Sequence, residues 1–412
     1  MSQVSPTLPE AVTTPEPLAD AEVERLRRDT PGVAERLHLN NAGAALPPRP
    51  VLDTMLDYLR REAHLGGYET EDEAAERIAA VYGDVAALLA ARPENVALVE
   101  NATVAFSLAL SAIPFRAGDV LVTSQNDYPS NRIQYQALIE RFGIEVQTAA
   151  ELPAGGIDPD SVAALARNPR CRLVAVSWVP TSSGLIQDVE AVGEAAAAAG
   201  VPYLIDACQA VGQLPVDAPR LRCDYLAATA RKFLRGPRGI GFLYVSDRAL
   251  DRGEYPLGVD MRGAALQGSQ LDLADTAKRF ENWEFSYALV LGLGAAARYA
   301  RAVRVERSGA RAIELAAYLR RKLAELPGIS LGDRGERLGA IVTAAVGGEI
   351  SPRQIVETLR LSGINLHAIH APAPGGGSRP LLRISPHYYN TREEVDAALA
   401  ALAPLLARGL RG

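Results

Sequence analysis

The sequence predicts an α/β protein with a largely parallel sheet between helices, followed by a smaller α/β domain. Two observations support this prediction. Between residue 50 and about residue 250, short apolar runs alternate with helical segments, which is the order expected of βα units. After residue 305 the alternation changes to longer helices separated by single strands. The chain has 412 residues, of which 48% are hydrophobic, so it is long enough to form two domains.

The elements are expected in the following order. The first block should hold helices at 51–63, 72–89, 102–112, 133–142 and 189–199, with strands at 96–99, 119–123, 172–177, 203–205, 225–228 and 241–245. A long helical region is expected over 276–305. The second block should hold helices at 307–325, 352–362 and 392–407 and strands at 339–346 and 381–384, with Thr391 capping the last helix. We expect a disordered leader at 1–20, a segment joining the small domain at 21–45, a large domain at 46–290 and a small domain at 291–412.

Composition excludes several classes of protein. The net charge is −6, and no basic stripe with interleaved aromatic residues is present, so we expect no nucleic-acid binding. The three cysteines are too few and too scattered for a disulfide framework, which favours a reducing compartment. Residues 1–20 carry prolines and acids without lysine or arginine, unlike a signal peptide, and no apolar run is long enough for a membrane span. We therefore expect a cytoplasmic protein.

The densest motif lies between residues 204 and 242. An apolar strand ends at Asp206, Lys232 follows 26 residues later (232 − 206), and a glycine-rich stretch occupies 236–241. An acid at a strand end lies at the carboxyl edge of the sheet, where α/β proteins bind ligands. Pyridoxal 5′-phosphate (PLP) needs a lysine for its Schiff base, a carboxylate for its ring nitrogen, phosphate anchors and a flat partner. The motif therefore predicts PLP bound through Lys232.

These residues, together with 100–103, 127–131 and 382–391, carry a family resemblance. Over nearly all of residues 36–405 the chain resembles the class V aminotransferase family of fold-type I PLP enzymes, which includes cysteine desulfurases and isopenicillin N epimerase. The resemblance implies a large domain with a mostly parallel seven-stranded sheet between helices and a smaller C-terminal α/β domain. It also implies a homodimer that acts on an amino-acid substrate.

The resemblance also implies roles for single residues. Lys232 would be the Schiff-base lysine and proton shuttle, and Asp206 would pair with the ring nitrogen. The other cofactor contacts would be a ring-stacking Tyr128, polar groups beside the ring from Thr181 and Gln209, and phosphate contacts from Ala102, Thr103, Thr229 and Arg231. A helix that starts at Ala102 would supply backbone amides to the phosphate.

Three further residues are candidates for substrate binding. Arg383 would grip the substrate α-carboxylate, because a guanidinium can donate two parallel hydrogen bonds to a carboxylate. Asn41 lies in a segment that resembles the one closing over the substrate, and Tyr68 is a weaker candidate. No metal site is expected, because His367 and His370 are an odd number of residues apart and would face opposite sides of a strand.

The reaction is harder to predict than the cofactor. Cysteine desulfurases need a nucleophilic cysteine on the loop before the carboxylate-binding arginine, and residues 367–380 contain none. Segments 66–69, 231–239 and 382–387 resemble a branch that includes ergothioneine-pathway C–S lyases, which cleave hercynylcysteine sulfoxide. The leading hypothesis is a β-eliminating C–S lyase. A class V aminotransferase or an amino-acid epimerase remains open, as does a PLP-binding protein without turnover, and the role of the glycine-rich loop 371–379 is undetermined.

Overall fold

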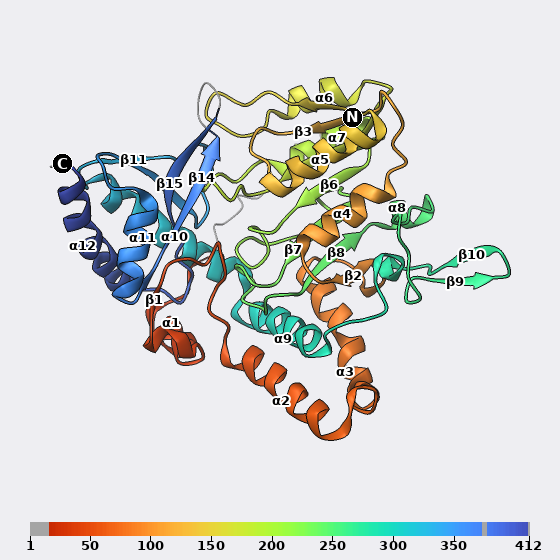
Figure 1. Ribbon diagram of the computed structural model, residues 1–412, viewed down its shortest axis with the longest axis horizontal. Helices are drawn as coiled ribbons and strands as arrows, with labels where there is room; N and C mark the ends of the chain where they lie inside the picture. Colours follow the sequence, from red (N-terminus) through yellow and green to blue (C-terminus); the bar gives the residue numbers. More distant parts are fainter. Residues whose placement is uncertain (1–15, 373–376, 411–412) are drawn as a thin grey trace, which may run out of the picture.

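A seven-stranded sheet forms the centre of the molecule (Figure 1). The computed structural model describes residues 16–372 and 377–410. In spatial order the strands are β2 (Val96–Val99), β8 (Gly241–Val245), β7 (Tyr225–Thr229), β6 (Tyr203–Asp206), β5 (Cys171–Ser177), β3 (Val120–Thr123) and β4 (Glu145–Thr148). Only β8 runs antiparallel to its neighbours, β2 and β7. The predicted mostly parallel seven-stranded sheet is therefore confirmed.

Both faces of this sheet are buried, because alternate side chains along a strand belong to two different buried clusters. On β5, Val174 and Val176 belong to one apolar cluster, whereas Leu173 and Ala175 belong to another on the opposite face. The first cluster includes side chains of helices α3 (Gly67–Leu88), α7 (Val189–Ala198) and α9 (Tyr287–Val303). The second includes side chains of α4 (Ala102–Ala112) and α5 (Pro129–Phe142). The sheet thus lies between two layers of helices.

A second, four-stranded antiparallel sheet is built from the C-terminal part of the chain. Its spatial order is β11 (Ile329–Leu331), β12 (Val342–Val346), β15 (Ser378–Ile384) and β14 (His367–Pro372). It is accompanied by α10 (Val305–Ala324), α11 (Pro352–Leu361) and α12 (Arg392–Gly409), and Thr391 caps α12 as expected. The short strand β1 (Leu37–His38) pairs with β13 (Ile364–Asn365), so the N-terminal segment joins this part of the molecule.

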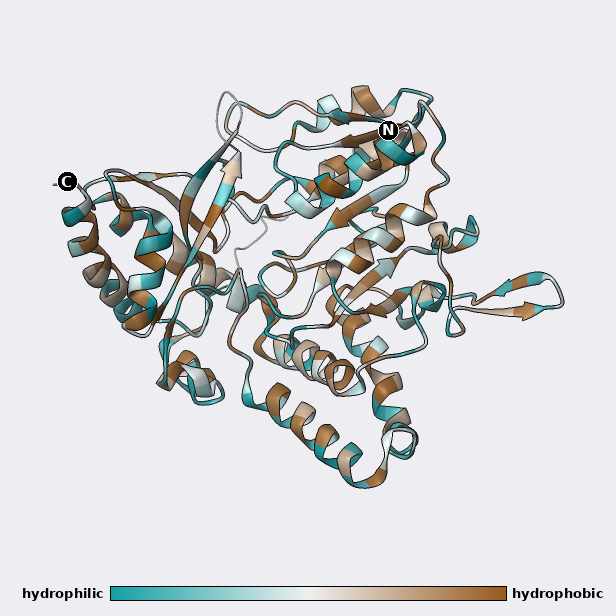
Figure 2. Cartoon of the chain, in the orientation of Figure 1, coloured by the Kyte–Doolittle hydropathy of each residue, from teal (hydrophilic) through white to brown (hydrophobic). Residues whose placement is uncertain are grey.

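The remaining elements lie around these two sheets. They are α1 (Asp20–Arg28), α2 (Arg49–Leu65), α6 (Pro159–Ala166), α8 (Asp247–Asp251), the hairpin β9 (Ala264–Gln267) and β10 (Gln270–Leu273), and 3-10 helices at Pro31–Ala34, Pro93–Asn95 and Ala277–Phe280. Figure 2 shows apolar and polar residues alternating along α2. Within residues 16–372 and 377–410, no helix combines the length and the apolar character needed to cross a bilayer.

The predicted long helix over 276–305 is wrong in its first third. A 3-10 helix ends at Phe280, and α9 begins only at Tyr287. Between them Glu281 is buried, and its carboxylate accepts hydrogen bonds from the Leu98 amide at 2.7 Å and from the Tyr82 hydroxyl at 2.9 Å. These contacts with β2 and α3 hold the segment in an extended form. Burial raises the pKa of Glu281 to about 7.

The predicted leader at 1–20 is too long. Residues 1–15 lie outside the described residues, but Leu18 is only 4% exposed and packs in a cluster with Val23, Leu26, Tyr388 and Tyr389. The prolines and acidic residues of this segment predicted disorder. That prediction did not take into account Leu18, whose buried side chain anchors the segment. Residues 16–20 are therefore part of the packed structure.

Candidate active site

Lys232, Asp206 and Tyr128 come together beside the carboxyl ends of β6 and β7. Asp206 is the last residue of β6, and Lys232 follows shortly after β7 ends at Thr229. Neighbouring parallel strands end at the same edge of a sheet, so the two residues approach each other despite their separation in sequence. The Lys232 amine lies 5.6 Å from the centre of the Tyr128 ring. Lys232 and Asp206 are 6% and 7% exposed, respectively.

The environment of Lys232 favours a neutral amine. Burial lowers the pKa of Lys232 below its ordinary 10.5, while the nearby Cys208 and Asp206 act in the opposite direction. Burial is the largest of these effects because it disfavours the charged ammonium. A neutral amine is the form that attacks an aldehyde, so the site prepares Lys232 for Schiff-base formation.

Two donors fix the carboxylate of Asp206. The Cys208 amide donates to Oδ1 at 3.0 Å, and the Asn131 side chain donates to Oδ2 at 3.1 Å. Asn131 is 2% exposed and also donates to Asp127 Oδ1 at 2.9 Å. Asp127 is fixed in turn by the hydroxyls of Thr123, Ser177 and Tyr135. Sequence reasoning used segment 127–131 for Tyr128 alone and missed Asp127 and Asn131, whose spacing of four residues was the available signal.

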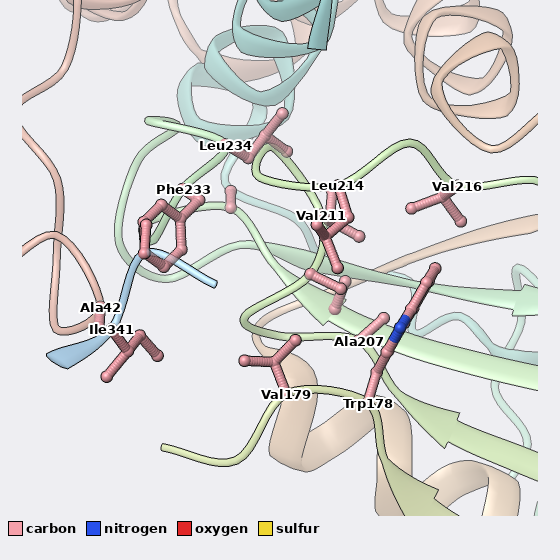
Figure 3. Close-up of a cluster of buried hydrophobic side chains, with 14 of the residues drawn as sticks. Ala42, Trp178, Val179, Ala207, Val211, Leu214, Val216, Phe233, Leu234 and Ile341 are labelled. Atoms are coloured by element: carbon pink, nitrogen blue, oxygen red, sulfur yellow. The ribbon is translucent and has the colours of Figure 1, made fainter. Parts of the chain in front are cut away.

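Apolar side chains lie next to these polar groups. Val179, Ala207 and Phe233 each stand one or two positions from a candidate site residue, and all three belong to the buried cluster drawn in Figure 3. Ala42 of the N-terminal segment and Ile341, which directly precedes β12, join the same cluster. The cluster packs against the segments that carry the site residues.

The start of α4 offers a place for an anion. The Asn101 side chain caps the Val104 amide at 3.1 Å, which leaves the amides of Ala102 and Thr103 without partners inside the helix. A Cβ atom at Gly241 would lie 3.2 Å from the Ala102 amide nitrogen, so a larger residue would crowd this helix end. Unpaired amides at a helix N-terminus suit a phosphate group.

Two more predicted phosphate contacts lie near the end of β7. Thr229 is the last residue of that strand and is 6% exposed. Arg231 donates to the carbonyl of Gly43, so its guanidinium is tied to the N-terminal segment. Burial, together with the charge of Arg238, lowers the pKa of Arg231. Thr229 thus lies at the carboxyl edge of the large sheet. Arg231 already has a hydrogen-bond partner within the protein, the Gly43 carbonyl.

Arg383 is buried without a counter-charge. It lies on β15, is 3% exposed, and donates to Thr181 Oγ1 at 2.7 Å and to Asn40 Oδ1 at 3.3 Å. Its Nε has no hydrogen-bond partner, and no carboxylate in the described part of the chain pairs with it. Burial lowers the pKa of Arg383 from 12.5 to about 10. Because burying an unpaired charge is costly, this arrangement indicates an anionic ligand.

Gln209 connects the N-terminal segment with Thr181 through hydrogen bonds. It is 2% exposed, and its Nε2 donates to the Ala42 carbonyl at 3.1 Å and to Thr181 Oγ1 at 3.4 Å. Its Oε1 is buried and has no hydrogen-bond partner. Thr181 therefore touches both Gln209 and Arg383, and the buried orphan oxygen of Gln209 leaves a hydrogen bond for a bound group to satisfy.

Asn41 and Tyr68 are placed differently from the other candidates. Asn41 is fully buried, donates to the Ser385 carbonyl at 2.8 Å and accepts from the Tyr389 hydroxyl. Its amide is thus used by the protein, and the neighbouring Asn40 is the side chain that meets Arg383. Tyr68 is 75% exposed near the start of α3.

The turn after Lys232 is anchored by Arg235. The Arg235 amide donates to the Lys232 carbonyl at 2.9 Å, and Arg235 has a left-handed φ of 61°. Its buried guanidinium donates to Thr30 Oγ1 at 2.7 Å, to the Leu46 carbonyl at 2.9 Å and to the Tyr388 hydroxyl. The lysine-bearing turn is therefore fixed by residues near both ends of the chain.

The two histidines that could suggest a metal pair lie on one strand. His367 and His370 lie on β14, opposite Arg383 and Pro380, and their odd spacing directs them to different faces of the strand. Among residues 16–372 and 377–410, no group of three histidine, cysteine or acidic side chains could hold a metal ion.

The residues present fit PLP. They supply a buried amine, a fixed carboxylate, an aromatic ring, a helix N-terminus and an orphaned buried amide oxygen around one edge of the sheet. A large, mostly parallel sheet carrying this set defines a fold-type I PLP-dependent enzyme. The model of one family, Aminotransferase class-V, matches residues 37–398. The chain therefore belongs to the class V aminotransferase family, and its cofactor is PLP.

Relatives and solved structures agree with this assignment. The chain is 29% identical over 413 residues to a probable cysteine desulfurase of Xylella fastidiosa (strain 9a5c), covering 95% of this chain and 97% of the relative. It is 29% identical over 400 residues to a cysteine desulfurase of Pectobacterium atrosepticum, covering 92% and 97% of the two chains.

Two solved structures share the fold. The cysteine desulfurase from Thermococcus onnurineus NA1 is similar with a TM-score of 0.84 and 23% identity, covering 93% of this chain and 98% of that one. The cystine C–S lyase C-DES, in complex with cysteine persulfide, is similar with a TM-score of 0.81 and 24% identity, covering 91% and 99%. Both comparisons support the predicted fold class.

Proposed function

We propose that this protein is a C–S lyase that cleaves a cysteine S-conjugate or sulfoxide by β-elimination, with hercynylcysteine sulfoxide as one candidate substrate. The observation that carries the proposal is a carboxylate-binding arginine, Arg383, preceded by a segment without cysteine: residues 367–382 contain none. The names of the relatives, cysteine desulfurase and cystine C–S lyase, support chemistry at the C–S bond of a cysteine-like amino acid.

The cysteines that are present are poor nucleophiles. Cys171 and Cys223 are buried, and burial raises the pKa of the Cys208 thiol. A thiol needs to form a thiolate to attack sulfur, so a raised pKa opposes that role. This supports release of the sulfur group directly from the substrate, without a persulfide on the enzyme.

Each residue has a defined task in the proposed reaction. Arg383 binds the α-carboxylate with its unsatisfied donors and so orients the substrate. Bound PLP supplies an electron sink for the negative charge that develops at the α-carbon. Lys232 Nζ takes the α-proton and can return a proton to the departing sulfur, while Asp206 accepts a hydrogen bond from the ring nitrogen. Overall, a thioether S-conjugate and one water give a thiol, pyruvate and ammonium, whereas a sulfoxide and one water give a sulfenic acid in place of the thiol.

The test is release of pyruvate. Purified holoenzyme is incubated with cysteine S-conjugates and their sulfoxides, with Lys232→Ala as a control that should lose both visible cofactor absorbance and turnover. Turnover only after a keto acid is added would instead support the class V aminotransferase. Change of configuration at the α-carbon without release would support the epimerase, and alanine formed from free cysteine would support a desulfurase.

We also propose that the protein is a homodimer in the cytoplasm. The exposed apolar residues Leu56, Leu59, Leu65 and Tyr68 lie along α2 and the start of α3, and their burial against a second copy would remove apolar surface from water. The three unpaired cysteines favour a reducing compartment. Light scattering tests the dimer: a monomer at micromolar concentration contradicts it, and Tyr68→Arg should weaken association.

A further inference from the structure

A cavity of about 300 Å³ adjoins the candidate active site. Three of its walls continue segments that carry site residues. Gln125 and Asn126 directly precede Asp127 and Tyr128, and Ser182 and Ser183 directly follow Thr181. Arg379 and Leu381 line it from β15, the strand that carries Arg383. The cavity therefore lies beside three of the segments that carry site residues.

The strand β15 relates the cavity to the carboxylate-binding arginine. Residues 379, 381 and 383 alternate with their neighbours, so their side chains leave the same face of the strand. At about 3.3 Å per residue, the Cα atoms of Arg379 and Arg383 are roughly 13 Å apart. Two long arginine side chains on one face can thus contact the two ends of a single small molecule.

The cavity carries a net positive charge. The Nε of Arg379 is shielded from solvent and has no hydrogen-bond partner. Arg334 donates to the Pro153 carbonyl at 3.3 Å, and in the described part of the chain neither arginine is paired with a carboxylate. Glu151 also lines the cavity, and it accepts a hydrogen bond from Asn126 at 2.5 Å. Two guanidiniums and one carboxylate therefore face the same space.

We propose that this cavity binds a carboxylate carried by the sulfur-linked group of the substrate, with Arg379 and Arg334 as its partners. The inference rests on the proposed C–S lyase function and narrows its substrates to cysteine S-conjugates whose thiol part is anionic. A single carboxylate suits the site, because Glu151 would repel a doubly charged group. Glu151 can also accept a hydrogen bond from an ammonium group beside that carboxylate, as in an amino-acid-like thiol.

The experiment compares two substrates of the same size with the holoenzyme. S-(2-carboxyethyl)-L-cysteine carries the distal carboxylate, and its carboxamide analogue lacks the charge. The wild-type protein should prefer the carboxylate by about tenfold or more in kcat/KM, as expected for a charge-assisted pair in a partly buried site. Arg379→Gln should bring the two kcat/KM values close together. The matched control is Arg353→Gln, on the exposed face of α11, which should keep the wild-type preference.

Failure of this inference can be told apart from failure of the lyase function. Equal turnover of both substrates by the wild-type protein would overturn the distal subsite and leave the lyase in place. If neither substrate is cleaved, the lyase function fails. The distal subsite is then tested by the binding affinity of substrate analogues. The α-methyl derivatives of both compounds have no α-proton to lose, and their dissociation constants follow from the change in cofactor absorbance. Tighter binding of the carboxylate supports the subsite, and equal binding refutes it.

Discussion

Replacing Arg383 with methionine should abolish tight binding of amino acids and yet leave the stability of the protein almost unchanged. A pKa lowered from 12.5 to about 10 means that folding disfavours the charged guanidinium by about 3 kcal/mol. At pH 7 this cost is fully present, because the group is protonated in both states, and it disappears only as the pH rises through about 10 to 12.5. Loss of the three hydrogen bonds, two to Thr181 and one to Asn40, offsets about 1 kcal/mol each. The net change in the free energy of unfolding should therefore be close to zero.

Arg320 is the matched control, because it is a buried arginine with a partner. It is 8% exposed, and its Nε lies 2.8 Å from Asp333 Oδ2. Arg320→Met would leave Asp333 buried with its charge uncompensated, which should cost about 3–5 kcal/mol. The two substitutions are chemically identical, so the difference between their effects would come from the carboxylate that Arg320 contacts and that Arg383 lacks within the described residues.

The assay is urea unfolding of the PLP-free proteins at pH 7, because bound cofactor would add its own stabilisation. In parallel, kcat/KM for an S-conjugate should fall by roughly 30-fold or more in Arg383→Met, since breaking a buried charge pair costs about 2–5 kcal/mol. If Arg383→Met lowers the free energy of unfolding as much as Arg320→Met does, and kcat/KM is retained, Arg383 is a structural residue and the reasoning is refuted.

Three further outcomes are expected. The rate at which PLP-free protein recovers its visible absorbance should reach half its maximum below pH 10.5, because burial lowers the pKa of Lys232 and more amine is neutral at a given pH; a midpoint at or above that value contradicts this. Asn131→Leu should weaken PLP binding about tenfold, because it removes the donor to Asp206 Oδ2; an unchanged dissociation constant in a fluorescence titration would show that the contact is dispensable. Gly241→Ala should lower the urea midpoint by an amount equivalent to about 1–3 kcal/mol, since its Cβ would lie 2.5 Å from a backbone carbonyl, whereas Gly258→Ala, with nothing within 4 Å, should not.

The sequence revealed those strands whose burial leaves a clear pattern. Strands β5, β6, β7 and β8 are buried on both faces, so they read as short, mostly apolar runs. Strand β4, with the polar sequence EVQT at the sheet edge, carries no such run, and the hairpin of β9 and β10 is largely exposed. These elements were missed because tertiary position, not local composition, makes them strands.

The residues of the candidate site also fall into those that the sequence predicts and those that it does not. Lys232 and Asp206 could be predicted from the sequence because each lies in a local motif. The roles of Asn131 and Asn40 depend on contacts between segments 75 and 343 residues apart in the chain, respectively. Such pairs follow from how α5 packs beside β6 and how the N-terminal segment pairs with the end of β15, which residue spacing alone does not encode.

The hydrogen bonds of the Arg235 guanidinium have a consequence for folding during synthesis of the chain. Its partners Thr30 and Leu46 leave the ribosome long before Tyr388 does. The turn that presents Lys232 therefore gains its last tether only when synthesis is almost complete. We therefore expect the vitamin-derived cofactor to be loaded late in biogenesis, and a nascent chain that stalls before Tyr388 to carry the Lys232 amine on a turn that lacks this tether.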